Sequence, residues 1–161
     1  MSNASFEDVT AMLTSLGPDL DVSAITALSE ERSWAIAIDE DGEEIIGVEL
    51  DDADERLVFN ATLGMPPVGR ELATYRFLLG LNAGWPETGG VWTALGPDEH
   101  EVIVFVGLPL FHLTAGTLGT VIKNFVATRG MLTALVAVGI GEDGPDGDSP
   151  MPDPSLGYTR A

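Results

Sequence analysis

The segment VWTALGPDEHEVIVFVGLPL, residues 91–110, decides the fold of this chain. Two apolar runs flank a Gly-Pro-Asp turn at residues 96–98, so the segment predicts two antiparallel strands, Val91–Leu95 and Glu101–Leu108. The second run is apolar at every position from 102 to 106. Because successive side chains of a strand point to opposite faces of a sheet, both faces of this strand need a cover.

Upstream of this segment, the sequence predicts one helix and three strands. Apolar residues recur at helical spacing over Phe6–Leu16, after the candidate N-cap Ser5 and before a Gly-Pro pair at residues 17–18. Three later runs alternate apolar residues with smaller or polar ones, which is typical of strands. These predicted strands are Arg32–Asp39, Glu44–Leu50 and Arg56–Leu63, with a tight turn at Asp41-Gly42 between the first two.

Two further helices complete the predicted domain. After the Met-Pro-Pro run at residues 65–67, which interrupts strand pairing, apolar residues return to helical spacing over about Val68–Asn82, and a longer helix covers Thr114–Val138. The predicted fold is α+β, an antiparallel sheet with three helices in the order α-β-β-β-α-β-β-α, in one domain over residues 1–138. Residues 139–161 are rich in Gly, Pro and Asp and predict a disordered acidic tail, because their few apolar side chains cannot offset the ordering entropy.

The charge of the chain limits its partners. Its 161 residues include 26 acidic and 7 basic ones, for a net charge of −19 at pH 7. Nucleic-acid phosphates and anionic membrane surfaces repel such a protein, whereas basic or amphipathic polypeptides do not. The N-terminus lacks the cationic and apolar stretches of a signal peptide, and no run approaches the ~18 uninterrupted apolar residues of a membrane span. We therefore expect a cytoplasmic protein that inserts in no membrane and binds no nucleic acid.

The side chains of the sequence do not point to catalysis. Cysteine is absent, which excludes disulfides and thiolate chemistry, and His100 and His112 have no partner at metal-ligand spacing. Residues 139–144 match G-x-G-x-x-G, but they follow a predicted helix, whereas a dinucleotide site follows a strand. We expect no catalytic residue, no metal, no cofactor and no enzyme activity. The enzymatic alternative uses acidic residues and requires a concave pocket with desolvated carboxylates.

The apolar strand at residues 101–108 has more apolar surface than a domain of this size readily covers. The neighbouring strand and the helix before it share this surplus, and a second copy of the chain would cover it. We therefore predict a symmetric dimer that buries at least about 1,000 Å². The alternative is that the long C-terminal helix alone covers the second face of the sheet. The predicted interface residues are Leu72, Tyr75, Leu79, Trp85, Val91, Trp92 and Leu95.

With this order of elements, the chain resembles the class I type III secretion chaperones of the Tir-chaperone (CesT) family over roughly residues 6–138. The likeness rests on the opening helix FEDVTAMLTSLG, the hairpin WAIAIDEDG, and LVFNATLGMPP before the second helix. It also includes FLLGLN at the end of that helix and GGVWTALGPDEHEVIVFVGLPL before the last one. The glycines of the last helix and the acidic tail depart from the family pattern.

The resemblance implies a function without catalysis. It implies a homodimer that pairs through the second helix and the fourth predicted strand, and a partner, the N-terminal segment of a secreted effector. The predicted function is an ATP-independent chaperone that keeps a type III effector export-competent. The alternative is a YbjN-like regulatory protein-interaction module without a secreted client. For Phe6 and Val9 the alternative is plain core packing, because the same helical stripe serves either purpose. The candidate effector-binding residues are Phe6, Val9, Leu13, Leu16, Trp34 and Ile36.

Overall fold

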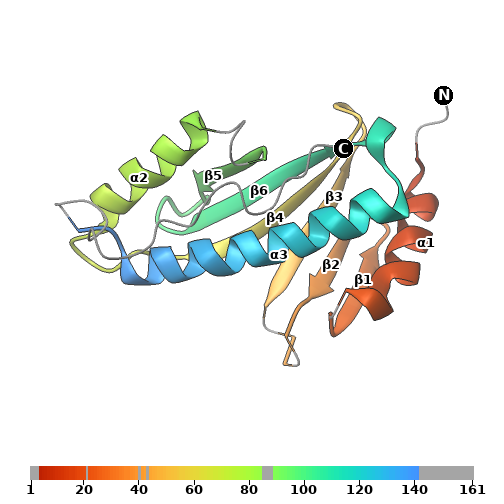
Figure 1. Cartoon of the computed structure of the whole chain (residues 1–161), viewed down its shortest axis with the longest axis horizontal. Coiled ribbons are helices and arrows are strands. Elements are labelled where there is room, and N and C mark those ends of the chain that lie inside the picture. The colour runs from red at the N-terminus through yellow and green to blue at the C-terminus, as the bar shows by residue number, and fades with distance from the viewer. Residues whose placement is uncertain (1–3, 21, 40, 43, 85–88, 142–161) are drawn as a thin grey trace. The chain divides into compact units, whose positions relative to one another are not determined.

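Three α-helices and six strands form the fold in this computed structural model, which describes residues 4–20, 22–39, 41–42, 44–84 and 89–141. The strands join in one antiparallel sheet with the order β1-β2-β3-β4-β6-β5 (Figure 1). The predicted α+β class is confirmed, and the three predicted helices and five predicted strands occur in the predicted order along the chain. The elements are α1 (Phe6–Leu16), the 3₁₀ turn η1 (Gly17–Asp19), β1 (Ala24–Leu28), β2 (Ser33–Ala37), β3 (Ile45–Asp51), β4 (Arg56–Gly64), α2 (Glu71–Ala83), β5 (Val91–Leu95), β6 (Val102–Pro109), the 3₁₀ turn η2 (Leu110–His112) and α3 (Ala115–Val138).

The structure adds one strand, β1, to the five predicted ones. β1 pairs with β2 in antiparallel register, with Ile25 opposite Ile36. It forms one edge of the sheet, and four of its five residues are exposed. A strand without a buried face has no alternation of buried apolar and exposed polar residues, so the sequence pattern does not reveal it.

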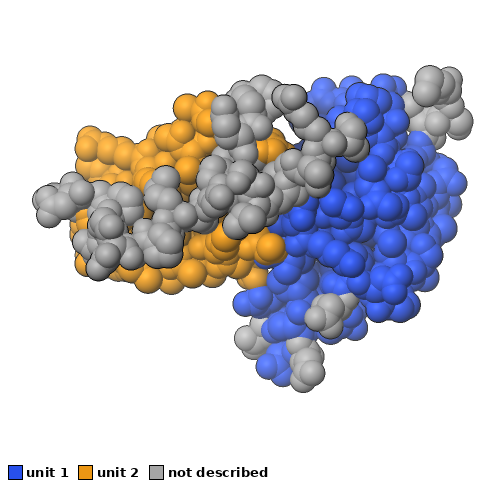
Figure 2. Space-filling view, in the orientation of Figure 1, with its two compact units in different colours: residues 1–61, 106–126 blue, residues 62–105, 127–161 orange. Residues whose placement is uncertain are grey.

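The chain divides into two compact units (Figure 2). Unit 1 comprises residues 1–61 and 106–126, and unit 2 comprises residues 62–105 and 127–161. Unit 1 therefore holds α1, β1, β2 and β3, unit 2 holds α2 and β5, and the remaining strands and α3 contribute residues to both. The boundary expected at residue 138 remains a prediction, since most of the acidic tail, residues 142–161, lies outside the described residues.

A row of large side chains across three strands forms the core of unit 1. Trp34 of β2 lies opposite Val48 of β3, which lies opposite Phe59 of β4, and all three are buried. Phe125 of α3 packs on this row, with its ring centroid 6.2 Å from that of Phe59. Because burying a large apolar side chain stabilises a fold by roughly 1.5–3 kcal/mol, this row accounts for much of the stability of unit 1.

Helix α1 is fixed at its N-terminus and along one face. The Ser5 hydroxyl accepts from the Asp8 N–H at 3.2 Å, and the Asp8 carboxylate accepts from the Ser5 N–H at 2.9 Å. The backbone hydrogen bond from Ser5, and then its hydroxyl, lower the pKa of Asp8. On the inner face, Phe6 stacks on Trp34 with ring centroids 4.6 Å apart, and the Trp34 indole N–H donates to Thr10 Oγ1 at 2.9 Å. These contacts attach α1 to β2.

The C-terminus of α3 is attached to the start of α2 within unit 2. Gly139 has a φ of +70° and donates its N–H to a carbonyl of the last helical turn at 2.9 Å, which ends α3. Arg70 donates to the Val138 carbonyl at 3.0 Å, and the Thr74 hydroxyl accepts from the Ile140 N–H at 2.9 Å. The chain therefore leaves α3 beside the first turn of α2.

We expect Gly139→Ala to destabilise the protein and Gly130→Ala to stabilise it. A Cβ at position 139 lies 2.9 Å from Pro67 Cδ and 3.0 Å from Arg70 Cβ, and the positive φ is unfavourable for alanine. The free energy of unfolding, measured by urea denaturation, should fall by roughly 2–4 kcal/mol. A Cβ at position 130 of α3 meets no atom within 4 Å, so this matched control should gain up to about 1 kcal/mol of helix propensity. Equal effects of the two changes would contradict the packing around Gly139.

Helix α3 is largely apolar in composition, with Lys123 and Arg129 as its charged residues. By length and composition alone, this described helix could cross a membrane, which a search for uninterrupted apolar runs does not detect. A core helix of a soluble protein passes the same test. Leu118, Ile122 and Phe125 of α3, which are spaced by four and three residues, are buried. The core of unit 1 therefore accounts for part of this apolar composition.

Candidate protein-interaction surfaces

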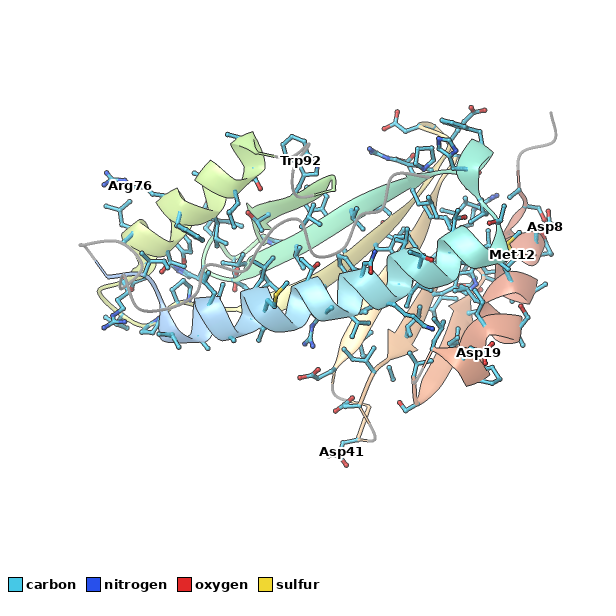
Figure 3. The ribbon with its side chains drawn as sticks, viewed as in Figure 1. Asp8, Met12, Asp19, Asp41, Arg76 and Trp92 are labelled. Atoms are coloured by element: carbon cyan, nitrogen blue, oxygen red, sulfur yellow. The ribbon has the colours of Figure 1, made fainter. Side chains whose placement is uncertain are left out.

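Helix α2 and strand β5 pack against each other in unit 2 and present exposed apolar side chains. Leu72 and Leu79 of α2 are 62% and 64% exposed, and Leu95 and Trp92 of β5 are 45% and 38% exposed. We call these four residues the α2–β5 surface; Figure 3 labels Trp92 on β5. Large apolar side chains that stay exposed are typical of protein-interaction sites, so α2 and β5 are candidate interface elements.

The spacing of residues along α2 produces this exposure. Thr74 and Leu78, four residues apart, are buried. Leu72, Arg76 and Leu79 follow one another at intervals of four and three residues, so they share the opposite, exposed face of the helix. Figure 3 shows the Arg76 side chain extending away from α2. The exposed face of α2 thus consists of two leucines on either side of a guanidinium group.

Four of the seven predicted interface residues make up the α2–β5 surface, and the other three do not. Tyr75 is half-buried, and its hydroxyl donates to the His100 carbonyl at 2.9 Å. Val91 is buried. Trp85 lies outside the described residues. The exposed members of the predicted interface therefore lie on two adjoining elements, with Trp92 and Leu95 on opposite faces of β5 because they are three residues apart.

The turn between β5 and β6 is held by a carboxylate. Asp98 accepts from the N–H groups of His100 and Glu101, each at 3.2 Å, and the Glu101 bond, followed by the His100 bond, lowers the pKa of Asp98. Partial burial, and then the negative charges of Glu71 and Asp98, raise the pKa of Tyr75. Tyr75 therefore remains a neutral hydrogen-bond donor at neutral pH.

Asn82 of α2 occupies the outer edge of β5. Its side-chain NH₂ donates to the Thr93 carbonyl at 2.8 Å, and its side-chain oxygen accepts from the Thr93 N–H at 2.8 Å. Since the N–H and C=O of one strand residue point to the same side, the Asn82 amide stands where a further strand would pair. β5 ends the strand order, so this contact closes that edge of the sheet at Thr93. A partner therefore cannot add a strand to β5 at Thr93 and binds the side chains of the α2–β5 surface instead.

We expect Asn82→Ala to lower the free energy of unfolding by roughly 2–4 kcal/mol, because the buried Thr93 loses partners for its N–H and its C=O. Asn82→Asp keeps the acceptor for the Thr93 N–H but sets a carboxylate oxygen against the Thr93 carbonyl, so it should also destabilise the protein. The measurements are urea denaturation and hydrogen exchange of the Thr93 amide. Unchanged protection of this amide in Asn82→Ala would show that the contact does not form.

Strand β6 has one buried face and one partly covered face. Val102 and Val104 are buried, whereas Ile103 and Phe105 are half-buried. The alternating exposure follows from the opposite orientation of successive strand residues. The face of β6 that holds Ile103 and Phe105 therefore remains partly exposed to solvent. The sequence pattern indicates such uncovered apolar area on this strand.

The six candidate effector-binding residues belong to unit 1, and the structure buries four of them. Phe6 and Leu16 are half-buried: Phe6 covers the Trp34 ring, and Leu16 Cδ2 lies 3.4 Å from the position of a Cβ on Gly119 of α3. The prediction that the other four contact a client directly conflicts with their burial, because their side chains present no surface. These four, which pack in the core, are Val9, Leu13, Trp34 and Ile36.

Part of the accessible apolar surface of unit 1 lies at the edge strand β1, and Ile45 of β3 and Phe111 of η2 are also exposed. Leu28 is exposed and Ile25 is half-buried, beside the start of η1 at Gly17. No strand of the described chain pairs with the outer side of β1. Its backbone groups are therefore available to an extended peptide. We call β1 together with Phe6 and Leu16 of α1 the α1–β1 edge.

The acidic side chains are spread over turns. Among the residues that the structure describes, no group of three or more His, Cys, Asp or Glu side chains could hold a metal ion. Arg56 pairs with Asp51 at 3.1 Å and with Asp54 at 2.9 Å, and Arg32 pairs with Asp52 at 3.1 Å. Exposed ion pairs of this kind contribute at most about 1 kcal/mol each. The acidic residues therefore act mainly through the net charge.

Comparison with known proteins assigns the chain to a family. The sequence model of the Tir chaperone protein (CesT) family matches residues 11–132, which include α2, β5 and most of α1. The chain belongs to the CesT family. No curated protein matches this CesT-family chain in sequence.

Solved structures share the CesT-family fold at low sequence identity. A chain of the ExsC–ExsE complex superposes with a TM-score of 0.67 at 16% identity, over 82% of this chain and 96% of that chain. A chain of the HopA1–SchA chaperone–effector complex gives 0.63 at 14% identity, over 84% of this chain and 100% of that chain. YbjN from E. coli gives 0.54 at 14% identity, over 82% of this chain and 88% of that chain. At these identities the likeness establishes the fold.

Two residues of α2 that lie next to the α2–β5 surface, Arg76 and Asn82, are absent from the sequence-based prediction of this CesT-family chain. Arg76 continues the helical spacing of Leu72 and Leu79, so a search for charged residues within the exposed apolar face of α2 would have found it. Asn82 pairs with Thr93, eleven residues later in the chain, and no pattern within either element indicates that contact. It depends on how α2 packs on β5.

Proposed function

We propose that this CesT-family protein is a homodimeric, ATP-independent chaperone that binds the N-terminal segment of a type III secreted effector in the cytoplasm and keeps it competent for export. The observation that carries this proposal is the α2–β5 surface in a chain of a chaperone family. The fold shared with a chain of a chaperone–effector complex supports it. Binding of this kind draws its free energy from contacts, so no step requires ATP or catalysis.

The α2–β5 surface supports pairing with a second copy. Its four residues are large and apolar, and in a twofold dimer each residue that lies at the interface is buried once in each copy. The half-buried Ile103 and Phe105 of β6 add apolar area within unit 2. Because Asn82 closes the edge of β5, the copies pair through side chains and not by joining their sheets. A stable dimer requires about 1,000 Å² or more of buried area.

The α1–β1 edge supports client binding. A disordered effector segment can hydrogen-bond to the outer side of β1 and place apolar side chains beside Leu28, Phe6 and Leu16. Each buried anchor contributes roughly 1.5–3 kcal/mol, partly offset by ordering of the segment, so a client needs several anchors. The net charge of −19 accelerates capture of a basic segment. The client therefore combines extended backbone, apolar anchors and positive charge.

Capture of a client tests this proposal. We expect an affinity-tagged chain, purified from its native cell, to retain a type III substrate whose N-terminal segment resists proteolysis in the complex. Leu28→Asp should reduce the recovered client by at least about tenfold, because a carboxylate at the edge of β1 opposes apolar anchors. Phe111→Asp, which adds the same charge at an exposed position of η2, is the matched control. Recovery of the chain without any secretion substrate, under conditions that keep weak complexes, would contradict the proposal.

The likeness to YbjN favours a second candidate function. In this alternative the chain is a regulatory protein-interaction module without a secreted client. The same capture experiment separates the two functions, because the alternative requires a partner that stays in the cell and is not a secretion substrate.

A further inference from the structure

The chain beyond the described residues starts beside α2. Arg70 and Thr74 of α2 hold Val138 and Ile140 at the end of α3, and Gly141 is the last residue described. The tail, residues 142–161, contains twenty residues and reaches up to roughly 66 Å when extended. Helix α2, with 13 residues, is only about 20 Å long. The tail is therefore long enough to reach every exposed residue of α2.

Arg76 gives the exposed face of α2 a positive charge in an acidic protein. Within the described part of the chain, Arg76 makes no ion pair, whereas Arg32 and Arg56 pair with aspartates. Glu71, the acidic residue of α2, is occupied at the start of the helix, where its carboxylate accepts from the Gly69 N–H at 2.6 Å. An anion near α2 therefore meets an available guanidinium group at the centre of the face.

The tail has the complementary chemistry. Carboxylates suit Arg76, and apolar side chains suit Leu72 and Leu79 on either side of it. Most other surfaces of a chain with a net charge of −19 repel an acidic segment. The tail carries the acidic residues Glu142, Asp143, Asp146, Asp148 and Asp153, one basic residue, Arg160, and the large apolar residues Met151, Leu156 and Tyr158.

We propose that residues 142–161 dock on the exposed face of α2 in their own protomer and compete with the second copy for the α2–β5 surface. This inference rests on the proposed homodimer. A short tether keeps the tail at a millimolar effective concentration, so weak contacts are sufficient. Two protomers pair only when the tail of each has left its α2 face. If the tail covers about three quarters of the molecules, about one quarter of the protomers can pair, so the dimer dissociation constant rises by roughly 16-fold.

The test compares full-length chains by sedimentation equilibrium. The variant combines Met151→Ser, Leu156→Ser and Tyr158→Ser, which removes the apolar anchors of the tail and keeps every charge. Repulsion between two copies is therefore the same in both proteins. We expect the dimer dissociation constant of the variant to be at least about tenfold lower than that of the natural sequence.

A peptide of residues 142–161 completes the test. Added to the variant at millimolar concentration, the natural peptide should restore weak dimerisation, while a peptide with the three serines should not. Equal dissociation constants for the natural sequence and the variant would overturn the role of the tail and leave the dimer in place. Monomers in both proteins would instead contradict the homodimer on which the inference rests.

Discussion

Leu79→Asp will convert the proposed dimer to a monomer with the chain mass of 17.0 kDa. Leu79 lies on the exposed face of α2, so the change leaves the core of unit 2 intact. In the dimer, each protomer loses apolar contacts worth roughly 1.5–3 kcal/mol and buries an unpaired carboxylate. Because the twofold axis repeats the change, the dissociation constant should rise by at least about 1,000-fold. Trp92→Asp on β5 should have a similar effect.

The matched control for Leu79→Asp is Phe111→Asp. Phe111 is 72% exposed and belongs to unit 1, so this change adds the same charge outside the α2–β5 surface. Sedimentation equilibrium should show an unchanged dissociation constant for the control. If Leu79→Asp and Trp92→Asp both remain dimeric, the copies pair through another part of the chain.

Trp34→Ala will lower the free energy of unfolding by roughly 3–5 kcal/mol. The Trp34 side chain is buried, stacks on Phe6, and donates its indole N–H to Thr10, so truncation leaves a cavity and removes one of the two hydrogen bonds of the Thr10 hydroxyl, which still donates to the Phe6 carbonyl. Phe111→Ala is the matched control: Phe111 is an aromatic residue of unit 1 that is 72% exposed, and its truncation should cost less than about 1 kcal/mol. Urea denaturation at one fixed protein concentration measures both.

The same pair of variants separates core packing from client binding at Trp34. If Trp34→Ala retains the stability of the natural sequence and loses its client, Trp34 contacts the client directly, as the sequence pattern alone suggests. If it loses stability as expected, Trp34 supports the α1–β1 edge from the interior. The buried position of Trp34 favours the second result.

The core of the fold was predictable because its strands alternate strongly. Val102 and Val104 of β6 are buried while Ile103 between them is half-buried, and the same alternation marks β3 and β4. Strand β1 was not predictable, because four of its five residues are exposed and an edge strand requires no apolar face. Its pairing with β2 supplies the backbone hydrogen bonds that the sequence pattern does not encode.

The exposed apolar residues of α2 were predictable because the segment has more apolar residues than one buried helix face can hold. Leu72 and Leu79 lie outside the buried face of α2, and the sequence indicates this surplus. On α1, the spacing of Val9 and Leu13 is equally compatible with a core and with a groove, and only tertiary packing decides between them. The contact of Asn82 with β5 likewise depends on packing between two elements.

The mass of the full-length chain in solution tests the central claim most directly. At about 100 µM, sedimentation equilibrium should give twice the chain mass of 17.0 kDa, because in the proposed dimer a second copy covers the exposed apolar residues of α2 and β5. The tail variant with three serines should keep this mass at lower concentration. A mass of 17.0 kDa at every concentration, in both proteins, would contradict the account.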